Sequence, residues 1–269
     1  YELLSTSLKI KEKNNLFIVS GKVFTDEKNN YLKLLSEFNK SYLQNSNIKN
    51  IKIKSINNFS FDINKKFKIK NLIIKSEIDL KNLEYKNNKL ALEKYFPNFK
   101  ELIEFKNHKI LIKYNNEQLE IEGKGNLFIE KKKEKIDYKI TNNKGEYFFD
   151  TKVDINKNEF LIDIFNYKKK EKIKSTISLK GIYKKNKKIK FNSILYVENN
   201  NKFLVKNLIL SKNFKVINLD LLDFSFVNSN KIKNQIILSK INNDYQLQGN
   251  SFDATKMIDL MFSENNNNG

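Results

Sequence analysis

The segment that decides the fold is residues 174–197, which read KSTISLKGIYKKNKKIKFNSILYV. Counted in steps of two, it places apolar residues mostly on one side and lysine, serine and threonine mostly on the other. The alternation breaks at the lysine-rich stretch 184–188 and then resumes. The residues on the apolar side are Ile177, Leu179, Tyr183, Ile189, Phe191, Leu195 and Val197. Because a β-strand has a period of two, the segment predicts two strands and a turn, each strand with one apolar and one polar face.

The same pattern recurs along most of the chain, with asparagine-rich turns at intervals of roughly ten to fifteen residues. Only 7 Gly and 1 Pro are present, so asparagine, which tolerates positive φ, takes the turn positions. Short connections favour pairing between successive strands. The predicted fold class is therefore mainly β: a long antiparallel meander that forms a curved, open hydrophobic groove, with a few short amphipathic helices.

The first boundary between predicted segments of the chain lies at about residue 46. Residues 1–46 predict a hairpin followed by an amphipathic helix from about Asp26 to Asn45, where apolar residues recur three and four apart. Residues 47–250 predict the extended antiparallel β-groove. One short helix near 95–105 interrupts it, because Pro97 suits the first turn of a helix.

The end of the chain changes period again. Residues 251–262 predict a C-terminal helix, since apolar residues there return to helical spacing and Ser251 or Asp253 can cap its start. The polar residues 263–269 predict a disordered tail.

The charge of the chain is strongly positive, with a formal net value of +20. Such an excess ordinarily indicates nucleic acid or an anionic surface as partner. All 51 basic residues, however, are lysine. Arginine is the residue that reads phosphate and guanine with a planar fork, so its absence argues against a nucleic-acid partner. The lysine excess still leaves a surface that favours anionic lipid headgroups.

Residues that could perform catalysis are scarce. The chain has one histidine, His108, and no cysteine, which leaves no nucleophile–base pair and no metal-ligand cluster. We expect no enzymatic activity and no cofactor. His108 is predicted to be an exposed residue at the start of a strand. The lysine clusters at 131–135, 168–172 and 184–188 are predicted to be solvated hairpin tips that discourage aggregation.

Two segments resemble a known family. Residues 123–186 and the closing YQLQGNSFDATKMIDLM, 245–261, look like the repetitive β-region of AsmA-like, YhdP-type proteins of the bacterial envelope. The most specific part is the step from Gly249 through SFDA into a helix. The resemblance implies a non-enzymatic, bridge-like lipid carrier that conducts phospholipid acyl chains along a hydrophobic β-groove between the inner and outer membranes.

The resemblance also implies where such a protein works and what it meets. It implies a periplasmic protein anchored in the inner membrane by a segment that is not in this chain. Its partners would be phospholipids, the surfaces of the two membranes and other envelope proteins. Period two and the resemblance together predict the groove-lining residues Leu127, Ile129, Tyr138, Ile140, Ile177, Leu179, Phe191, Leu195 and Val197.

Two other functions fit the same alternation. A structural or scaffolding β-protein of the envelope, with a closed core and no cargo, has the same strand pattern. An outer-membrane β-barrel also alternates, but its lipid-facing band excludes lysine, and a segment such as LKIKEK at 8–13 fits that band poorly.

Overall fold

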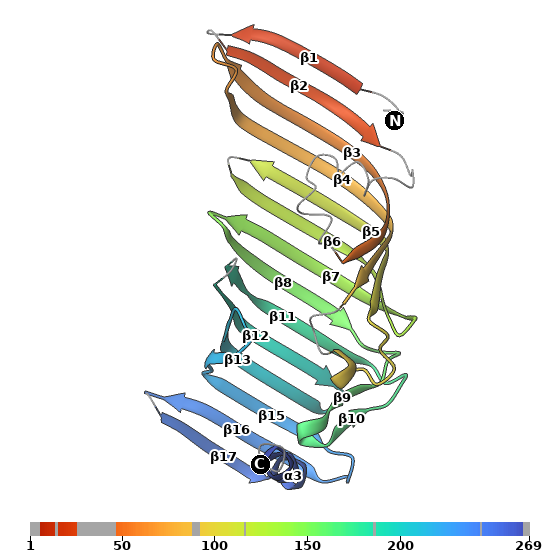
Figure 1. Ribbon diagram of the computed structural model, residues 1–269, viewed down its shortest axis with the longest axis vertical. Coiled ribbons are helices and arrows are strands. Elements are labelled where there is room, and N and C mark those ends of the chain that lie inside the picture. Colours follow the sequence, from red (N-terminus) through yellow and green to blue (C-terminus); the bar gives the residue numbers. More distant parts are fainter. Residues whose placement is uncertain are drawn as a thin grey trace. The chain divides into compact units, whose positions relative to one another are not determined.

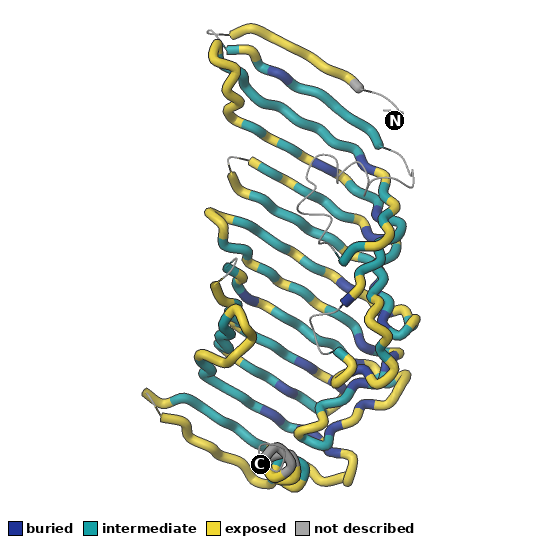
Figure 2. Tube along the Cα trace, in the orientation of Figure 1, coloured by how far each residue is buried: buried dark blue, intermediate teal, exposed yellow. Residues whose placement is uncertain are grey.

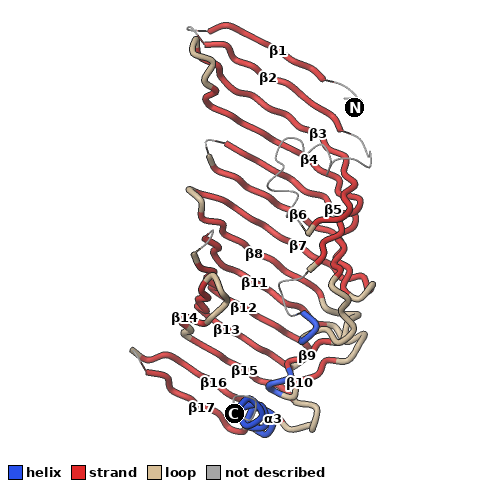
Figure 3. Tube along the Cα trace, viewed as in Figure 1, coloured by secondary structure: helices blue, strands red, loops and turns tan. Residues whose placement is uncertain are grey.

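The computed structural model shows a protein built almost entirely of strands (Figures 1 and 3). It divides into two compact units, which are described separately below. The residues that the structure describes are 6–13, 16–25, 47–87, 92–115, 117–184, 187–242 and 244–265.

The first unit comprises residues 1–87, 102–128 and 135–148. Valine, isoleucine, phenylalanine and tyrosine recur at alternate positions along it, and such residues pack well on a pleated surface. Its strands are β1 (Thr6–Lys13), β2 (Leu16–Thr25), β3 (Ile48–Asn64), β4 (Ile69–Lys86), β5 (Leu102–Asn115) and most of β6 (Gln118–Ile129) and β7 (Lys132–Asn143). The predicted hairpin at the start is present, because β1 and β2 pair along their length. The helix predicted for 26–45 lies outside the described residues.

The second unit comprises residues 88–101, 129–134 and 149–269. It contains most of the irregular structure. Its strands are β8 (Glu146–Asp154, in part), β9 (Phe160–Ile162), β10 (Tyr167–Lys169), β11 (Ser175–Lys184), β12 (Lys188–Glu198), β13 (Asn201–Ser211), β14 (Val216–Asn218), β15 (Leu221–Val227), β16 (Lys233–Ile241) and β17 (Asp244–Ser251). Its helical elements are the 3₁₀ turns η1 (Leu92–Lys94) and η2 (Asp163–Phe165) and the helix α3 (Thr255–Asn265).

Fifteen of the described strands form one open sheet. The order is β1-β2-β3-β4-β5-β6-β7-β8-β11-β12-β13-β15-β16-β17, with β14 paired to β13. Strands that follow one another in the chain therefore pair, with two exceptions: β9 and β10 leave the sheet between β8 and β11, and β15 pairs with β13 and not with β14. The described registers are antiparallel. The prediction of a mainly β, antiparallel sheet is confirmed. No helix in the described ranges is long and apolar enough to cross a bilayer.

The short helix predicted near 95–105 is wrong. The 3₁₀ turn η1 ends at Lys94, a turn containing Pro97 follows, and β5 begins at Leu102. Residues from Leu102 onward form a strand and not a helix because they pair with β4: Ile103 lies opposite Tyr85 and continues the alternation along β5. The ladder of hydrogen bonds with β4 thus overrides the local helical spacing.

Residues 159–167, predicted as one more strand of the meander, instead leave the main sheet. β9 and β10 pair with each other in a separate two-stranded sheet, with η2 between them. Asn166 makes this return possible, because it adopts the left-handed conformation (φ 47°) at the end of η2. β11 then takes the place beside β8 in the strand order.

The C-terminal helix begins later than predicted. Ser251 is still part of β17, and α3 starts at Thr255, whose N–H donates to Oδ1 of Asp253 at 3.1 Å. The helix extends to Asn265, which lies inside the segment predicted to be a disordered tail. Residues 266–269 are outside the described part of the chain.

Candidate functional site

One face of the sheet in the second unit is apolar almost throughout. Cross-strand partners lie on the same face, so the register defines the face strand by strand. Leu179 lies opposite Ile194, and Ile194 lies opposite Val205. We call this surface the second apolar face, and its members are Ile177, Leu179, Ile189, Phe191, Ile194, Tyr196, Phe203, Val205, Leu208, Leu210, Leu222, Phe224, Phe226, Ile236 and Leu238.

The opposite face of the same strands is mixed. It carries ion pairs, with 2.9 Å between Lys180 Nζ and Asp150 and 2.6 Å between Lys202 Nζ and Asp223. Serine and lysine stand between its scattered apolar residues. The two faces therefore differ in chemistry, and only one offers a continuous apolar surface.

The first unit shows the same asymmetry. Val19 lies opposite Ile10 and Phe61, and further along the sheet Leu83 lies opposite Phe105. The first apolar face includes Leu8, Ile10, Phe17, Val19, Ile51, Ile53, Phe59, Phe61, Ile63, Ile74, Ile78, Leu80, Leu83, Phe105, Ile110, Ile112, Tyr114, Leu119, Ile121 and Leu127. The other face carries cross-strand ion pairs instead, as between Lys113 and Glu120 and between Lys109 and Asp79.

These apolar faces are only partly shielded from solvent (Figure 2). In the second unit Leu179, Ile194, Val205 and Leu222 are half-buried, neither fully exposed nor part of a closed core. In the first unit the side chain of Ile10 is 61% exposed. A sheet normally buries such a face against a second layer. The described residues form one large sheet, one small two-stranded sheet and short helical elements, so they supply little such cover.

An aromatic cluster closes one end of the second apolar face. The ring of Tyr167 from β10 lies 4.9 Å from that of Phe203, and Phe165 from η2 lies 5.2 Å from Phe224. Phe203 also stacks on Phe226 at 4.8 Å. The excursion between β8 and β11 thus covers the ends of β12, β13 and β15, and Tyr167 is fully buried.

The buried Tyr167 hydroxyl is held by polar partners. It donates to Oε2 of Glu198 at 2.5 Å and lies 3.0 Å from the hydroxyl of Tyr196. Burial, together with the bond to Glu198, raises the pKa of Tyr167 far above its ordinary value. Burial also raises the pKa of Tyr196 to about 12. Both phenols therefore stay protonated at neutral pH and act as structural donors.

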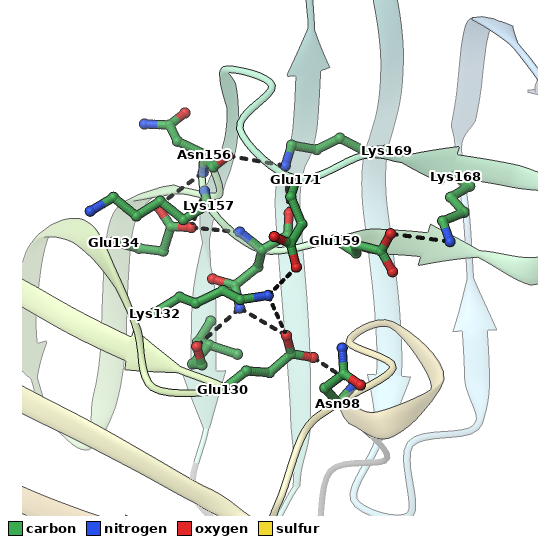
Figure 4. A network of polar contacts seen from close by, with 12 residues as sticks. Asn98, Glu130, Lys132, Glu134, Asn156, Lys157, Glu159, Lys168, Lys169 and Glu171 are labelled. Carbon is green, nitrogen blue, oxygen red and sulfur yellow. Dashed lines mark hydrogen bonds and ion pairs between the residues drawn. The ribbon is translucent and has the colours of Figure 1, made fainter.

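A buried polar network anchors the same excursion (Figure 4). Glu134 accepts hydrogen bonds from the backbone N–H groups of Asn156, Lys157 and Asn158, at 2.9, 2.6 and 3.1 Å. Lys169 donates to the carbonyl of Asn158 at 2.5 Å. One carboxylate thus satisfies three consecutive donors and fixes the start of the loop.

This network corrects the prediction that 131–135 and 168–172 are solvated tips at three positions, Lys132, Glu134 and Lys169. The other residues of both clusters are exposed, as predicted. Glu134 and Lys169 are almost completely buried, and Lys132 bridges Glu130 and Glu171. Burial lowers the pKa of Lys169. Burial also lowers the pKa of Lys132, but the hydrogen bonds to Glu171 and Glu130 outweigh it and the net direction is upward. In the third cluster, Lys187 and Lys188 are exposed, as predicted.

His108 is also placed differently from its prediction. Its side chain is 0% exposed and lies on the first apolar face, opposite Leu80. Nε2 is 3.0 Å from the carbonyl oxygen of Asn126, and the Tyr138 hydroxyl is 3.5 Å from Nδ1. Gly125 leaves room for the ring, because a Cβ there would lie 2.3 Å from Cδ2 of His108. Burial lowers the pKa of His108, so the ring is neutral at neutral pH.

The predicted groove-lining residues are divided between the two units, and most of them lie on or beside the apolar face of their own unit. Leu127 lies on the first apolar face, opposite Phe105. The Tyr138 side chain contacts His108, which lies on the same apolar face, and Ile140 is two residues further along β7. Ile129 is buried. Ile177, Leu179 and Phe191 lie on the second apolar face.

Leu195 and Val197 do not join this group. Leu195 lies opposite Ser178 and Val197 opposite Thr176, on the mixed face. The cause is a β-bulge at Asn192, where the register shifts by one residue. Counting in twos across Asn192 therefore missed Ile194 and Tyr196, which hold the positions on the apolar face. The asparagine inside the strand was the one available signal.

No protein-family model, curated protein or solved structure matches this chain. No group of three or more His, Cys, Asp or Glu side chains within the described ranges could hold a metal ion.

Proposed function

We propose that this chain is a non-enzymatic lipid carrier whose apolar sheet faces hold the acyl chains of phospholipids. The observation that carries the proposal is the asymmetry of each unit, with one half-buried, continuous apolar face backed by a face with ion pairs. Removing an acyl chain from water is worth about 0.8 kcal/mol per methylene, so a chain of about fifteen gains roughly 12 kcal/mol. A surface as apolar as a bilayer is sufficient for that gain, and no deep pocket is needed.

The apolar face suits movement of a lipid better than tight capture. Ile, Leu, Val and Phe recur on successive strands at similar spacing, so an acyl chain meets many equivalent positions along it. Equivalent positions give no deep minimum in which a chain would be trapped. In this proposal each apolar face forms an open, curved groove, and the resemblance to AsmA-like proteins adds transfer between the inner and outer membranes.

Photo-crosslinking at two neighbouring positions tests the proposal. Ile194 and Leu195 are consecutive and both half-buried, but only Ile194 is on the apolar face. Benzoylphenylalanine placed at Ile194 should form lipid adducts in cells, detected by mass spectrometry, and the same group at Leu195 should form few. Equal adducts at both positions, or none at Ile194, would contradict a lipid-bearing face.

Charge substitutions give a second test that separates a groove from a closed core. In a groove the ammonium group of Ile194→Lys can reach water, so the fold should persist while co-purifying lipid falls. In a closed core an unpaired buried charge is strongly destabilising. Leu195→Lys is the matched control and should keep both fold and lipid. Unfolding of Ile194→Lys together with a wild-type chain that carries no lipid would favour a structural sheet.

A further inference from the structure

Two hairpin tips, one in each unit, share an unusual sequence. The tip between β3 and β4 reads KKFKIK over 65–70, and the tip between β13 and β14 reads KNFKVI over 212–217. Every residue in both segments is exposed. Each tip has lysine on both sides of a phenylalanine, and a β-branched residue follows the lysine that comes directly after the phenylalanine.

The two tips also share one backbone geometry. Phe67 N–H donates to the carbonyl of Asn64 at 2.9 Å, and Phe214 N–H donates to that of Ser211 at 3.0 Å. The side chain at the first position then accepts from the N–H four residues later: Asn64 Oδ1 from Lys68 at 3.0 Å, and Ser211 Oγ from Lys215 at 3.1 Å. The same turn therefore presents phenylalanine at the same position twice.

The fourth position of this turn, occupied by Phe67 and Phe214, does not favour phenylalanine for the stability of the fold. Phe67 and Phe214 have φ of 56° and 59°, in the left-handed region that favours glycine and asparagine. Their side chains are 89% and 54% exposed, so neither ring contributes much to a core. A third turn with the same hydrogen bonds, from Asn228 to Ile232, has Lys231 at this position. The turn itself therefore does not require an aromatic ring.

The surroundings of the two rings are basic. Lys65, Lys66, Lys68 and Lys70 flank Phe67, and neither six-residue segment contains an acidic residue. An exposed aromatic ring among lysines matches the interface of an anionic bilayer, where the ring enters the boundary between headgroups and acyl chains and the ammonium groups meet phosphate. A nucleic acid would use the lysines but would leave Ile69, Val216 and Ile217 without an apolar partner.

We propose that the tips 65–70 and 212–217 dock this protein on anionic lipid surfaces by inserting Phe67 and Phe214. The inference rests on the proposed function for its setting, a protein that exchanges lipid with membranes. Its physical basis is separate, because Phe67 and Phe214 lie in the turns, before the first paired residues Ile69 and Val216, and so belong to neither apolar face.

Vesicle co-sedimentation tests the proposal with the full chain. The wild-type protein should bind vesicles of phosphatidylcholine mixed with phosphatidylglycerol, bind phosphatidylcholine alone weakly, and dissociate as salt rises. The double variant Phe67→Asn, Phe214→Asn should bind the mixed vesicles about tenfold more weakly, since two partly inserted rings are lost. Asparagine tolerates positive φ, so the variant should melt at or above the wild-type temperature.

Lys231→Asn is the matched control. It places the same residue at the same turn position in the third tip and removes one charge, so vesicle binding should fall much less than in the double variant. Equal binding to neutral and anionic vesicles, or wild-type binding by the double variant, would overturn the proposal. The same holds if a DNA duplex binds as strongly as the mixed vesicles and the double variant binds it equally well.

Crosslinking from position 194 in the Phe67→Asn, Phe214→Asn background separates this inference from the carrier proposal. Lipid adducts that persist while vesicle binding is lost support both. Vesicle binding that depends on the two rings, with no adduct at position 194, would sink the carrier proposal alone. Adducts in a wild-type chain that does not bind anionic vesicles would sink only the docking proposal.

Discussion

Phe191 and Ile194 lie on the same face of β12 although they are three residues apart in the chain. Phe191 is opposite Gly181 and Leu208, whereas Ile194 is opposite Leu179 and Val205. Two residues separated by three positions would point to opposite faces of a regular strand. Asn192 is the extra residue that brings them together, and it keeps the apolar face continuous across the strand.

Substituting an in-strand asparagine tests how such irregularities are stabilised. Asn107 in β5 has φ 54°, lies where the β5–β6 register shifts, and has an exposed side chain. Asn107→Ala should lower the free energy of unfolding by about 1 kcal/mol, because alanine resists the left-handed conformation. Asn107→Gly should stay close to the wild type, and urea unfolding compares the two. Equal losses would mean that backbone conformation is not what asparagine supplies there.

Removing the carboxylate of Glu134 should weaken the second unit strongly. Glu134→Ala leaves the N–H groups of Asn156, Lys157 and Asn158 without their acceptor. We expect a loss of about 3 kcal/mol in unfolding free energy, since each buried unsatisfied donor costs about 1 kcal/mol or more. Glu134→Gln keeps one acceptor oxygen and should lose roughly half as much. Stability unchanged in Glu134→Ala would show that the loop needs no such anchor.

The two buried tyrosines should differ in their contribution to stability. Tyr167→Phe removes the donor to the Glu198 carboxylate, and hydrogen bonds to charged groups are worth about 1.5–3 kcal/mol. Tyr196→Phe keeps that bond and should lose about 1 kcal/mol in chemical unfolding. A larger loss for Tyr196→Phe than for Tyr167→Phe would contradict the larger stabilising role assigned to the Tyr167 hydroxyl.

The raised pKa of Tyr196, about 12, also predicts that stability falls as pH rises above the ordinary tyrosine value of about 10.

His108 should make the fold sensitive to mild acid. Burial lowers its pKa in the folded state, so the unfolded chain takes up a proton first as pH falls. Stability is therefore full above the unfolded pKa of about 6.5 and is lost as pH falls from there toward the folded pKa. His108 is the only histidine, so His108→Gln should flatten urea stability between neutral and mildly acidic pH. An unchanged pH profile in the variant would exclude His108 as the cause.

Much of the sheet was predictable because apolar and polar residues mostly alternate along the sequence of each strand, which marks the residues of its apolar face. The segment 174–197 gave two strands and a turn, and the antiparallel order follows from short connections. The alternation failed where an extra residue entered a strand, as at Asn192. It also failed for 159–167, where one left-handed residue turns the chain back on itself.

The buried polar groups were not predictable in the same way. Glu134 and Lys169 sit in lysine-rich stretches that resemble solvated tips, and only the return of the excursion over the sheet buries them. Their partners are backbone groups some twenty residues away for Glu134 and about ten for Lys169, which no local pattern records. His108 likewise owes its burial to the space left by Gly125 on the neighbouring strand.

The in-strand asparagines have a consequence for how this chain can change in length. Insertions and deletions are ordinarily confined to loops, because a gain or loss of one residue within a strand inverts its faces. On either side of Asn107, Asn192 and Asn207, however, successive residues point to opposite faces of the sheet once the asparagine is left out of the count. Single residues can therefore be gained or lost at these points without exchanging the two faces. Deleting Asn192 should leave a chain that melts cooperatively, whereas deleting Leu195 should not.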